Sequence, residues 1–295
     1  MKIIVTGSLG NISKPLTKQL VANGHDVTVV SSDANKVNEI EALDAKAAIG
    51  SIADVDFLVQ TFSGADAVYT MIPPNFAATN YPKYVGDSGK TYAEAIKKAG
   101  IKRIVNLSSI GADIDGGTGQ ISGVHDAEIE LNKLEGVAIK HVRAGFFYTN
   151  FYNNIPMINQ GFMGSNYNSR TRLVMTHPQD IANIVAEELQ NSFTGKSVRY
   201  AVSDDRTFDE IVKIIGAAVG KPDLKWVEFT DEQAYDGMLQ GGLSPEVAQN
   251  FTEMGAAIRS AILWKDFDAT GCMISGKIKL EEFAKELVER LQVTA

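Results

Sequence analysis

The sequence has little of the cysteine and none of the long apolar runs on which several classes of protein depend. Cys272 is the only cysteine, so no disulfide can form within the chain and a metal site built on several thiolates is excluded. A single thiol fits a reducing compartment, and we expect a cytoplasmic protein. The apolar run before Thr6 is three residues long, far short of a signal-peptide core, and no segment approaches the length of a membrane span.

Positive charge is also scarce. Lysine and arginine number 28 against 36 aspartates and glutamates, the net charge is −8, and no basic cluster is present. Because a nucleic-acid surface needs concentrated positive charge to displace counterions, we expect no nucleic-acid partner. What the chain does have is 295 residues with 44% hydrophobic content, enough for one large α/β domain and a smaller lobe.

A glycine-rich turn near the start of the chain is the most informative feature present. A short apolar strand ends at Val5, and a loop with Gly7 and Gly10 opens a helix near Asn11. Gly7 allows a tight turn, Gly10 lets the backbone approach a ligand, and the first N–H groups of the helix favour phosphate. The third glycine position of this motif holds the small residue Ser13. The pattern predicts a pyrophosphate site at Gly7, Ser8, Leu9, Gly10, Asn11 and Ile12; the alternative is an ordinary turn before a surface helix.

Helices and strands alternate after this turn. Ile12, Leu16 and Leu20 mark one face of a helix, and the strand 26–30 completes a βαβ unit. Further strands are predicted at 47–49, 67–72, 103–107 and 137–142, with helices at 55–62, 91–99 and 125–134. The pattern predicts an α/β fold: a Rossmann-type doubly wound parallel sheet in residues 1–150, with a smaller C-terminal α/β substrate lobe mainly in residues 151–295, parts of which return to the Rossmann core.

Ligands of such sheets bind at the carboxyl ends of the strands. Several segments lie at the carboxyl ends of predicted strands, and we expect their residues to contact the same dinucleotide as the glycine turn. They are Ser31, Ser32, Lys36, Ser51, Ile52, Met71, Ile72, Pro73, Pro74, Ser108, Ser109, Gly145 and Phe146.

The second half of the chain begins with an aromatic segment. Phe147, Tyr148, Phe151 and Tyr152 are predicted to form a flat apolar slot for a planar substrate, with core packing as the alternative. Residues 161–169 are rich in Gly, Asn and Ser and predict a loop. Thr207 and Glu210 match a capping box. Helices are predicted at 178–190, 231–240, 245–262 and 280–291, and a strand at 197–202.

With these elements assigned, the chain resembles the NmrA-like branch of the atypical short-chain dehydrogenases, and within it the quinone and azo-dye reductases that use NADPH. The resemblance covers nearly the whole length. It rests on Thr6–Ile12, Gly64–Val68, Met71–Pro74, Asn106–Ser109, Arg143–Phe147 with Asn150, and Asp180–Ala182.

One departure from the wider family bears on chemistry. Short-chain dehydrogenases that act on carbonyls and alcohols use a tyrosine four residues before a lysine, and these places hold Ile121 and His125 here. A quinone or azo bond can accept a hydride without that tyrosine, because charge delocalises over the acceptor. The resemblance implies that His125, which quinone reductases of the family share, contacts the ribose or nicotinamide or donates a proton. The alternative is a solvated histidine in a first helical turn.

The choice of nucleotide depends on the end of the second strand, where NAD favours an acidic side chain and NADP a basic one. Ser31 and Ser32 are neither, and many NADP-preferring relatives have arginine at the place of Ser32. Two hydroxyls and Lys36 can hold a phosphate, while Asp33 would repel one if it points inward. We expect NADPH to be favoured over NADH, with a plain polar turn as the alternative.

The resemblance implies an NAD(P)H-dependent oxidoreductase that reduces quinones, azo compounds or similar small planar electron acceptors. Two alternatives stay open: a redox-sensing regulator that binds NAD(P) without turnover, and a reductase of another small electrophile. We expect no metal and no membrane partner, and the sequence leaves the oligomeric state, with a homodimer as one option, open.

Overall fold

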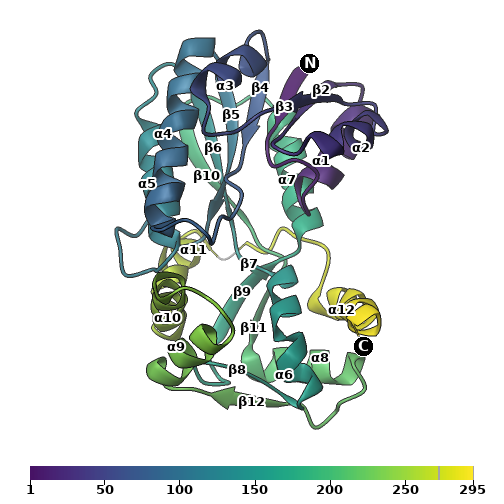
Figure 1. Ribbon diagram of the computed structural model, residues 1–295, viewed down its shortest axis with the longest axis vertical. Helices are drawn as coiled ribbons and strands as arrows, with labels where there is room; N and C mark the ends of the chain where they lie inside the picture. Colours follow the sequence, from purple (N-terminus) through teal and green to yellow (C-terminus); the bar gives the residue numbers. More distant parts are fainter. Residues whose placement is uncertain (272, 295) are drawn as a thin grey trace. The chain divides into compact units, whose positions relative to one another are not determined.

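The computed structural model describes residues 1–271 and 273–294, with side chains through residue 292 (Figure 1). Cys272, on which the expectation of a lone thiol depends, lies outside these residues. The chain forms two compact units. Unit 1 comprises Met1–Ala112, Gly123–Arg143 and Ile181–Arg199, and unit 2 comprises Asp113–Ser122, Ala144–Asp180 and Tyr200–Ala295. The predicted division into a Rossmann domain of residues 1–150 and a lobe of residues 151–295 stays a prediction.

The main sheet has seven parallel strands, which confirms the predicted fold class. Its spatial order is β10-β6-β5-β4-β1-β2-β3. The strands are β1 (Lys2–Val5), β2 (Asp26–Ser31), β3 (Lys46–Ile49), β4 (Ala67–Thr70), β5 (Arg103–Ser109), β6 (Ala138–Ala144) and β10 (Lys196–Ala201). Short apolar runs form these strands because parallel sheets are covered on both faces. All four residues of β4 are buried, as are Ile3, Ile4 and Val5 of β1.

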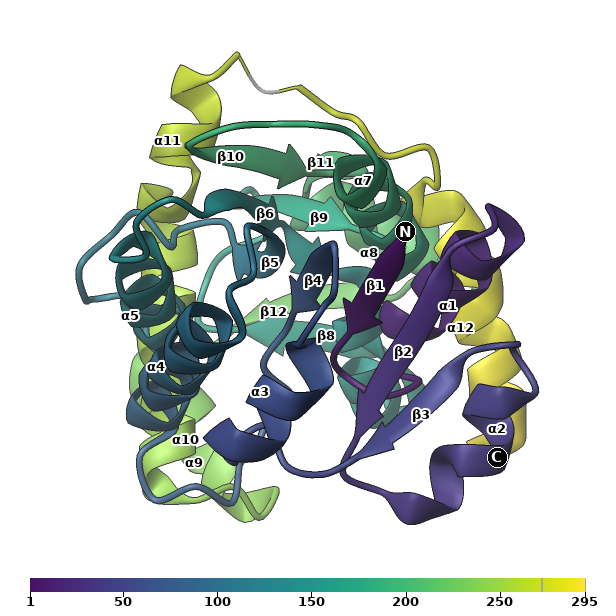
Figure 2. The same cartoon turned by 90° about the horizontal axis from the view of Figure 1, so that it is seen from above.

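Helices cover the sheet of unit 1 on both faces. The helices α3 (Val55–Phe62), α4 (Tyr81–Ala99) and α5 (Ile121–Asn132) lie on one face, and α1 (Ser13–Ala22) and α7 (Pro178–Gln190) on the other (Figure 2). A short α2 (Val37–Glu41) follows the 3₁₀ turn Ala34–Lys36. Asn23 and His25, just after α1, both bond Gln190 at the end of α7, at 3.0 and 3.1 Å.

The helix α4 is longer than the sequence indicates. A helix was expected over residues 91–99, but it begins at Tyr81. Gly86 and Gly89 lower helix propensity, yet both face α5: a Cβ at Gly89 would lie 2.6 Å from Ala127 Cα, and one at Gly86 would lie 3.0 Å from Asp126 Cβ. Close packing of the two helices therefore overrides the local preference.

Other elements of unit 1 also begin or end at residues that differ from the predicted ones. The strand β4 ends at Thr70 rather than residue 72, and β5 continues through Ser109, so Ser108 and Ser109 are the last residues of the strand instead of the turn after it. The helix α5 begins at Ile121, four residues before the expected start. As a result His125 lies within the helix, one turn from its first residue.

Unit 2 contains two small sheets of its own. One has the order β11-β9-β7 and the other pairs β12 with β8. The strands are β7 (Phe146–Phe147), β8 (Phe162–Ser165), β9 (Arg172–Thr176), β11 (Asp204–Thr207) and β12 (Lys225–Glu228). The loop expected over residues 161–169 therefore contains a strand, because its pairing partner Lys225–Glu228 comes about 60 residues later and leaves no local signal.

Helices make up the rest of unit 2. They are α6 (Ile155–Asn159), α8 (Phe208–Ala218), α9 (Asp231–Gln240), α10 (Pro245–Arg259), α11 (Lys265–Ala269) and α12 (Leu280–Thr294), with 3₁₀ turns at Tyr148–Asn154 and Ile262–Trp264. The capping box at α8 is confirmed: Thr207 Oγ1 accepts from Glu210 N, and the Glu210 carboxylate accepts from Thr207 N. In the described part of the chain no helix is long and apolar enough to cross a bilayer.

Candidate functional site

The turn between β1 and α1 has a backbone that only glycine fits at its first position. Gly7 has φ +91° and Ser8 follows at φ +54°. A Cβ at Gly7 would lie 2.5 Å from Met71 Sδ and 2.9 Å from Ser13 Oγ. Gly10 N–H donates to Gly7 O at 3.3 Å, which closes the turn. The sequence prediction of a tight turn at Gly7 is therefore met in its backbone geometry.

The beginning of α1 offers free donors to an anion. Ile12 occupies the N-cap position without a side-chain cap, and no partner for the N–H groups of Leu9, Asn11 and Ile12 is found among the described residues. Ser13 Oγ donates to Thr6 O at 2.8 Å and is buried, so the serine at the third glycine position ties the helix to the strand. Unpaired N–H groups and the positive end of the helix dipole suit a phosphate.

The polar residues at the end of β2 differ in whether they are buried in the turn or exposed on its surface. Ser31 is buried, and its Oγ accepts from Ser8 Oγ at 2.9 Å and from Asp33 N at 3.1 Å; it holds the turn together. Ser32 is exposed. The Asp33 carboxylate accepts from Asn35 N at 2.9 Å, which occupies it locally. Lys36 Nζ lies 2.7 Å from Glu39 in an exposed pair that raises the pKa of Lys36.

The segment after β4 is fixed beside the glycine turn. Met71 N donates to Thr6 Oγ1 at 2.8 Å, and Tyr92 OH donates to Met71 O at 2.7 Å. Ile72 packs against the core cluster of unit 1, and Pro73 O accepts from Tyr84 OH at 3.0 Å, so Met71, Ile72 and Pro73 are each held in place. After β3, Ser51 Oγ accepts from Ala53 N at 3.1 Å, and Ile52 packs against the same cluster.

The end of β5 connects to a buried ion pair that sequence reasoning missed. Ser108 Oγ donates to the Glu128 carboxylate, which also accepts from Arg143 Nε at 3.0 Å and Nη2 at 2.8 Å. All three residues are buried. Arg143 was part of the family motif, but nothing in the spacing pointed to Glu128. The Ser108 hydroxyl is therefore already hydrogen-bonded within this network. Ser109 Oγ donates to Ile110 O at 3.0 Å.

His125 is held by one nitrogen. Its Nδ1 lies 2.9 Å from Ala112 O, and because a carbonyl can only accept, Nδ1 carries the hydrogen and the neutral ring keeps a lone pair on Nε2. The ring is half-buried. A neutral imidazole oriented in this way can accept a hydrogen bond, and a protonated one can donate a proton from Nε2.

The predicted residues of unit 2 differ in accessibility. Gly145 packs closely, since a Cβ there would lie 2.8 Å from Val174 O. Tyr148 and Phe151 are buried, as the core-packing alternative describes, and burial raises the pKa of Tyr148. Phe146 and Phe147 are half-buried in β7. Tyr152 is half-buried with its ring centroid 5.4 Å from that of Phe283.

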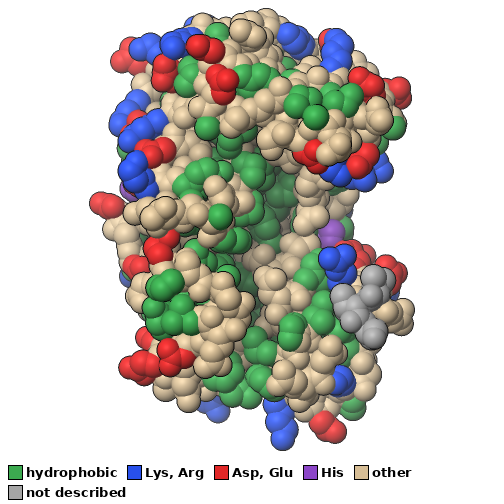
Figure 3. Space-filling model, in the orientation of Figure 1, with side chains coloured by type: hydrophobic (Ala, Val, Ile, Leu, Met, Phe, Trp, Pro, Cys, Tyr) green, Lys and Arg blue, Asp and Glu red, His purple; other side chains and the backbone are tan. Residues whose placement is uncertain are grey.

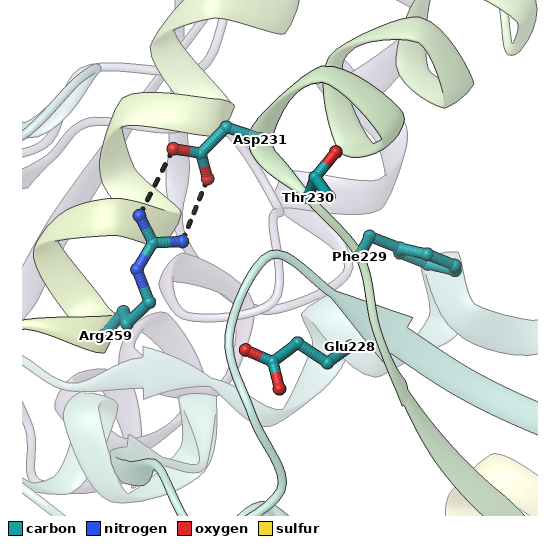
Figure 4. A pocket seen from close by; sticks show the side chains of 5 residues that line it. All are labelled: Glu228, Phe229, Thr230, Asp231 and Arg259. Atoms are coloured by element: carbon teal, nitrogen blue, oxygen red, sulfur yellow. Dashed lines mark hydrogen bonds and ion pairs between the residues drawn. The ribbon is translucent and has the colours of Figure 1, made fainter.

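Unit 2 also has a surface cavity of about 450 Å³, which sequence analysis did not single out. It is lined by Glu228, Phe229, Thr230, Asp231 and Arg259 (Figure 4). The Arg259 guanidinium donates to both carboxylate oxygens of Asp231, at 2.9 and 3.2 Å, so the positive charge in this cavity is already paired. Among the described residues no cluster of His, Cys, Asp or Glu suits a metal ion. On the face in Figure 3, Lys and Arg lie interspersed with Asp and Glu.

Comparison with known proteins connects this geometry to a family. Residues 1–261 match the sequence profile of the NmrA-like family. No protein with a curated description matches the chain.

Solved structures share the fold at low identity. An NADPH-dependent quinone oxidoreductase from Escherichia coli, complexed with NADPH, has a TM-score of 0.82 and 16% identity, covering 97% of this chain and 99% of that one. A triphenylmethane reductase from Citrobacter sp. has a TM-score of 0.79 and 18% identity, covering 98% and 100%. A nucleoside-diphosphate-sugar epimerase from Staphylococcus aureus has a TM-score of 0.78 and 19% identity, covering 97% and 100%.

Proposed function

This chain belongs to the NmrA-like family, and from that premise we propose that unit 1 binds a nicotinamide dinucleotide and that the protein is an NAD(P)H-dependent oxidoreductase. Its substrates would be quinones, azo compounds or similar small planar electron acceptors. The observation that carries the proposal is the turn at Gly7, where a positive φ, the contact with Met71 and the unpaired N–H groups at the start of α1 combine. Two of the similar structures are named as quinone and dye reductases.

The residues present fit the group. The N–H groups of Leu9, Asn11 and Ile12 would hold the diphosphate, Ser32 and Lys36 the adenosine ribose, and the segment Met71–Pro74 the adjoining part of the dinucleotide. NADPH is favoured over NADH in this proposal, because Lys36 can exchange its exposed partner Glu39 for a phosphate and Asp33 is occupied by Asn35 N. It also stays a prediction that four further residues contact the dinucleotide: Ser51, Ser109 and, in unit 2, Gly145 and Phe146.

Reduction of a quinone suits the acid–base groups of this chain. The nicotinamide, when bound, supplies a hydride, and the acceptor needs one further proton to become a hydroquinone. Ile121 stands where related dehydrogenases have tyrosine and is buried, so no hydroxyl is available there. His125 can deliver the proton from Nε2 while Ala112 O fixes its ring. Phe147 and Tyr152 stay candidate substrate contacts.

A panel of acceptors tests the activity. We expect oxidation of NADPH, followed by its absorbance, when a benzoquinone, a naphthoquinone or an azo dye is added to the protein. The second candidate, a redox sensor, is favoured by one observation, the apolar Ile121. If the protein binds nucleotide but turns over no acceptor, the redox-sensor proposal would replace the reductase proposal.

A further inference from the structure

Met71 places a sulfur atom against the glycine turn of unit 1. It follows β4, which pairs with β1 in the sheet (Figure 2). A Cβ at Gly7 would lie 2.5 Å from Met71 Sδ, 2.6 Å from Met71 Cγ and 2.9 Å from Ser13 Oγ. Because a Cβ is one bond from its Cα, the sulfur is in van der Waals contact with the Gly7 backbone. The thioether therefore lies close to both the turn and Ser13, the first residue of α1.

The backbone of Met71 is held in place beside this contact. Its N–H donates to Thr6 Oγ1 at 2.8 Å, and its carbonyl accepts from Thr6 Oγ1 at 3.3 Å and from Tyr92 OH at 2.7 Å. Thr6 and Tyr92 are both buried, so water does not compete for these bonds. If the Met71 side chain becomes larger, it must therefore displace the turn or project in front of it.

The thioether of methionine is open to a reversible oxidation that changes its size and polarity. Hydrogen peroxide transfers one oxygen atom to the sulfur: the peroxide O–O bond breaks, a sulfur–oxygen bond forms, the sulfur gives up two electrons, and water leaves. Met71 is half-buried, so its side chain is not sealed in the core, whereas Met163 and Met175 are fully buried. The product, a sulfoxide, is larger and polar, and it accepts hydrogen bonds.

We propose that Met71 is a modification site whose oxidation by peroxide weakens binding of the dinucleotide. This role rests on the proposed function, which assigns Met71 to the nucleotide site. An oxygen directed toward Gly7 displaces the turn, since even one added carbon there would overlap the sulfur. An oxygen directed away from Gly7 projects toward the phosphate and ribose oxygens, and acceptors that meet without a donor between them repel each other. Both orientations lower the affinity for NADPH.

The proposed reaction is itself a source of the oxidant. A hydroquinone that passes two electrons and two protons to dioxygen returns to the quinone and forms hydrogen peroxide. Oxidation of Met71 then lowers turnover when the hydroquinone accumulates. The change is reversible, because a methionine sulfoxide reductase restores the thioether at the expense of two thiols, which form a disulfide and water.

The test combines two measurements on the full chain after treatment with hydrogen peroxide and its removal. Peptide mass spectrometry gives the fraction of Met71 converted to sulfoxide, and calorimetric titration gives the dissociation constant of NADPH. In the wild type this constant should rise about tenfold on conversion and return after incubation with a methionine sulfoxide reductase. Met71→Leu keeps the size of the side chain and lacks the sulfur, so its dissociation constant should be the same before and after treatment.

Two further variants separate Met71 from other side chains that peroxide oxidises. Met273→Leu removes a methionine of unit 2 that is 75% exposed, and Cys272→Ser removes the only thiol. Both variants should lose affinity on treatment as the wild type does. Saturating NADP⁺ should slow the oxidation of Met71 and leave that of Met273 unchanged, because only Met71 lies at the proposed nucleotide site.

Several results would overturn this role of Met71. They are an unchanged affinity in wild type whose Met71 is fully converted, a Met71 that stays a thioether after Met273 has reacted, an equal loss of affinity in Met71→Leu, and oxidation of Met71 at the same rate with and without NADP⁺. Absence of NADPH binding before any treatment would instead overturn the proposed function, and the role of Met71 with it.

Discussion

Gly7 is the position in the turn where one added side-chain atom would clash with its neighbours. Gly7→Ala should weaken NADPH binding more than tenfold, because the new Cβ meets Met71 Sδ and displaces the turn. Gly24→Ala is the matched control: Gly24 also has positive φ, +80°, but nothing lies within 4 Å of the added Cβ. Each variant should lose about 1 to 2 kcal/mol of stability to backbone strain.

Isothermal titration calorimetry with NADPH, together with urea unfolding, separates the two effects. Equal nucleotide affinities in Gly7→Ala and Gly24→Ala would show that the turn does not contact the ligand.

His125 carries the proton-transfer prediction. His125→Ala should lower kcat for quinone reduction at least tenfold, with little change in the dissociation constant of NADPH, because only the group at Nε2 is lost from the reaction. His125→Asn can still donate to Ala112 O but cannot titrate, so it should be as slow as the alanine variant. Wild-type kinetics in either variant would remove His125 from the mechanism.

Single residues were predictable where they form one contiguous motif. Gly7 to Ile12 are neighbours in sequence, and the tight turn that they form follows from the order of strand, glycine and helix. Tyr148 and Phe151 illustrate the opposite case: an aromatic residue after a strand has the same local pattern in a pocket wall and in a core. Tyr148 is buried by residues distant in sequence, among them Phe283 of α12, more than 130 residues later.

At the scale of elements, the contact of α4 with α5 sets where His125 lies. Gly89→Ala should destabilise the protein by about 2 kcal/mol, since the added Cβ would lie 2.6 Å from Ala127 Cα and overpacking outweighs the better helix propensity of alanine. Gly237→Ala, in the exposed helix α9 with nothing within 4 Å, should stabilise it by about 1 kcal/mol. Chemical denaturation gives both values, and changes of the same sign would contradict the account.

Elements with a strong local pattern were predictable, and those that depend on distant partners were not. The helix Val55–Phe62 and the helix Asp231–Gln240 have the predicted bounds. The first ten residues of α4 were missed because Gly86 and Gly89 look like helix breakers until α5 is placed against them. β8 was missed because a short strand in a polar, glycine-rich segment depends on pairing with β12.

At the scale of the whole molecule, buried His141 links stability to pH. Its Nδ1 accepts from Asn106 Nδ2 and its Nε2 donates to Asn132 Oδ1, both at 3.1 Å. Burial lowers the pKa of His141, while Glu128 raises it and Arg143 and Lys196 lower it. Below about pH 6.5, His141 therefore takes up a proton in the unfolded chain while it stays neutral in the folded chain until the pH reaches its lowered pKa.

The free energy of unfolding should consequently be highest above that pH and decline below it, toward the lowered folded pKa of His141, by at most about 1.4 kcal/mol per pH unit from this group. Urea unfolding from pH 7.5 to 5 measures the decline. His141→Gln should flatten it, whereas His25→Gln, at a half-buried surface position, should not. Identical pH profiles for His141→Gln and the wild type would refute the assignment to His141.

The proposed reductase depends on binding of a nicotinamide dinucleotide to the Gly7–Ile12 turn. Calorimetric titration of the full chain with NADPH, NADP⁺, NADH and NAD⁺ measures that binding directly. The account predicts heat of association at a single site and tighter binding of the two forms that carry the extra phosphate. Absence of heat, and of any rise in Tm, with all four nucleotides would contradict it.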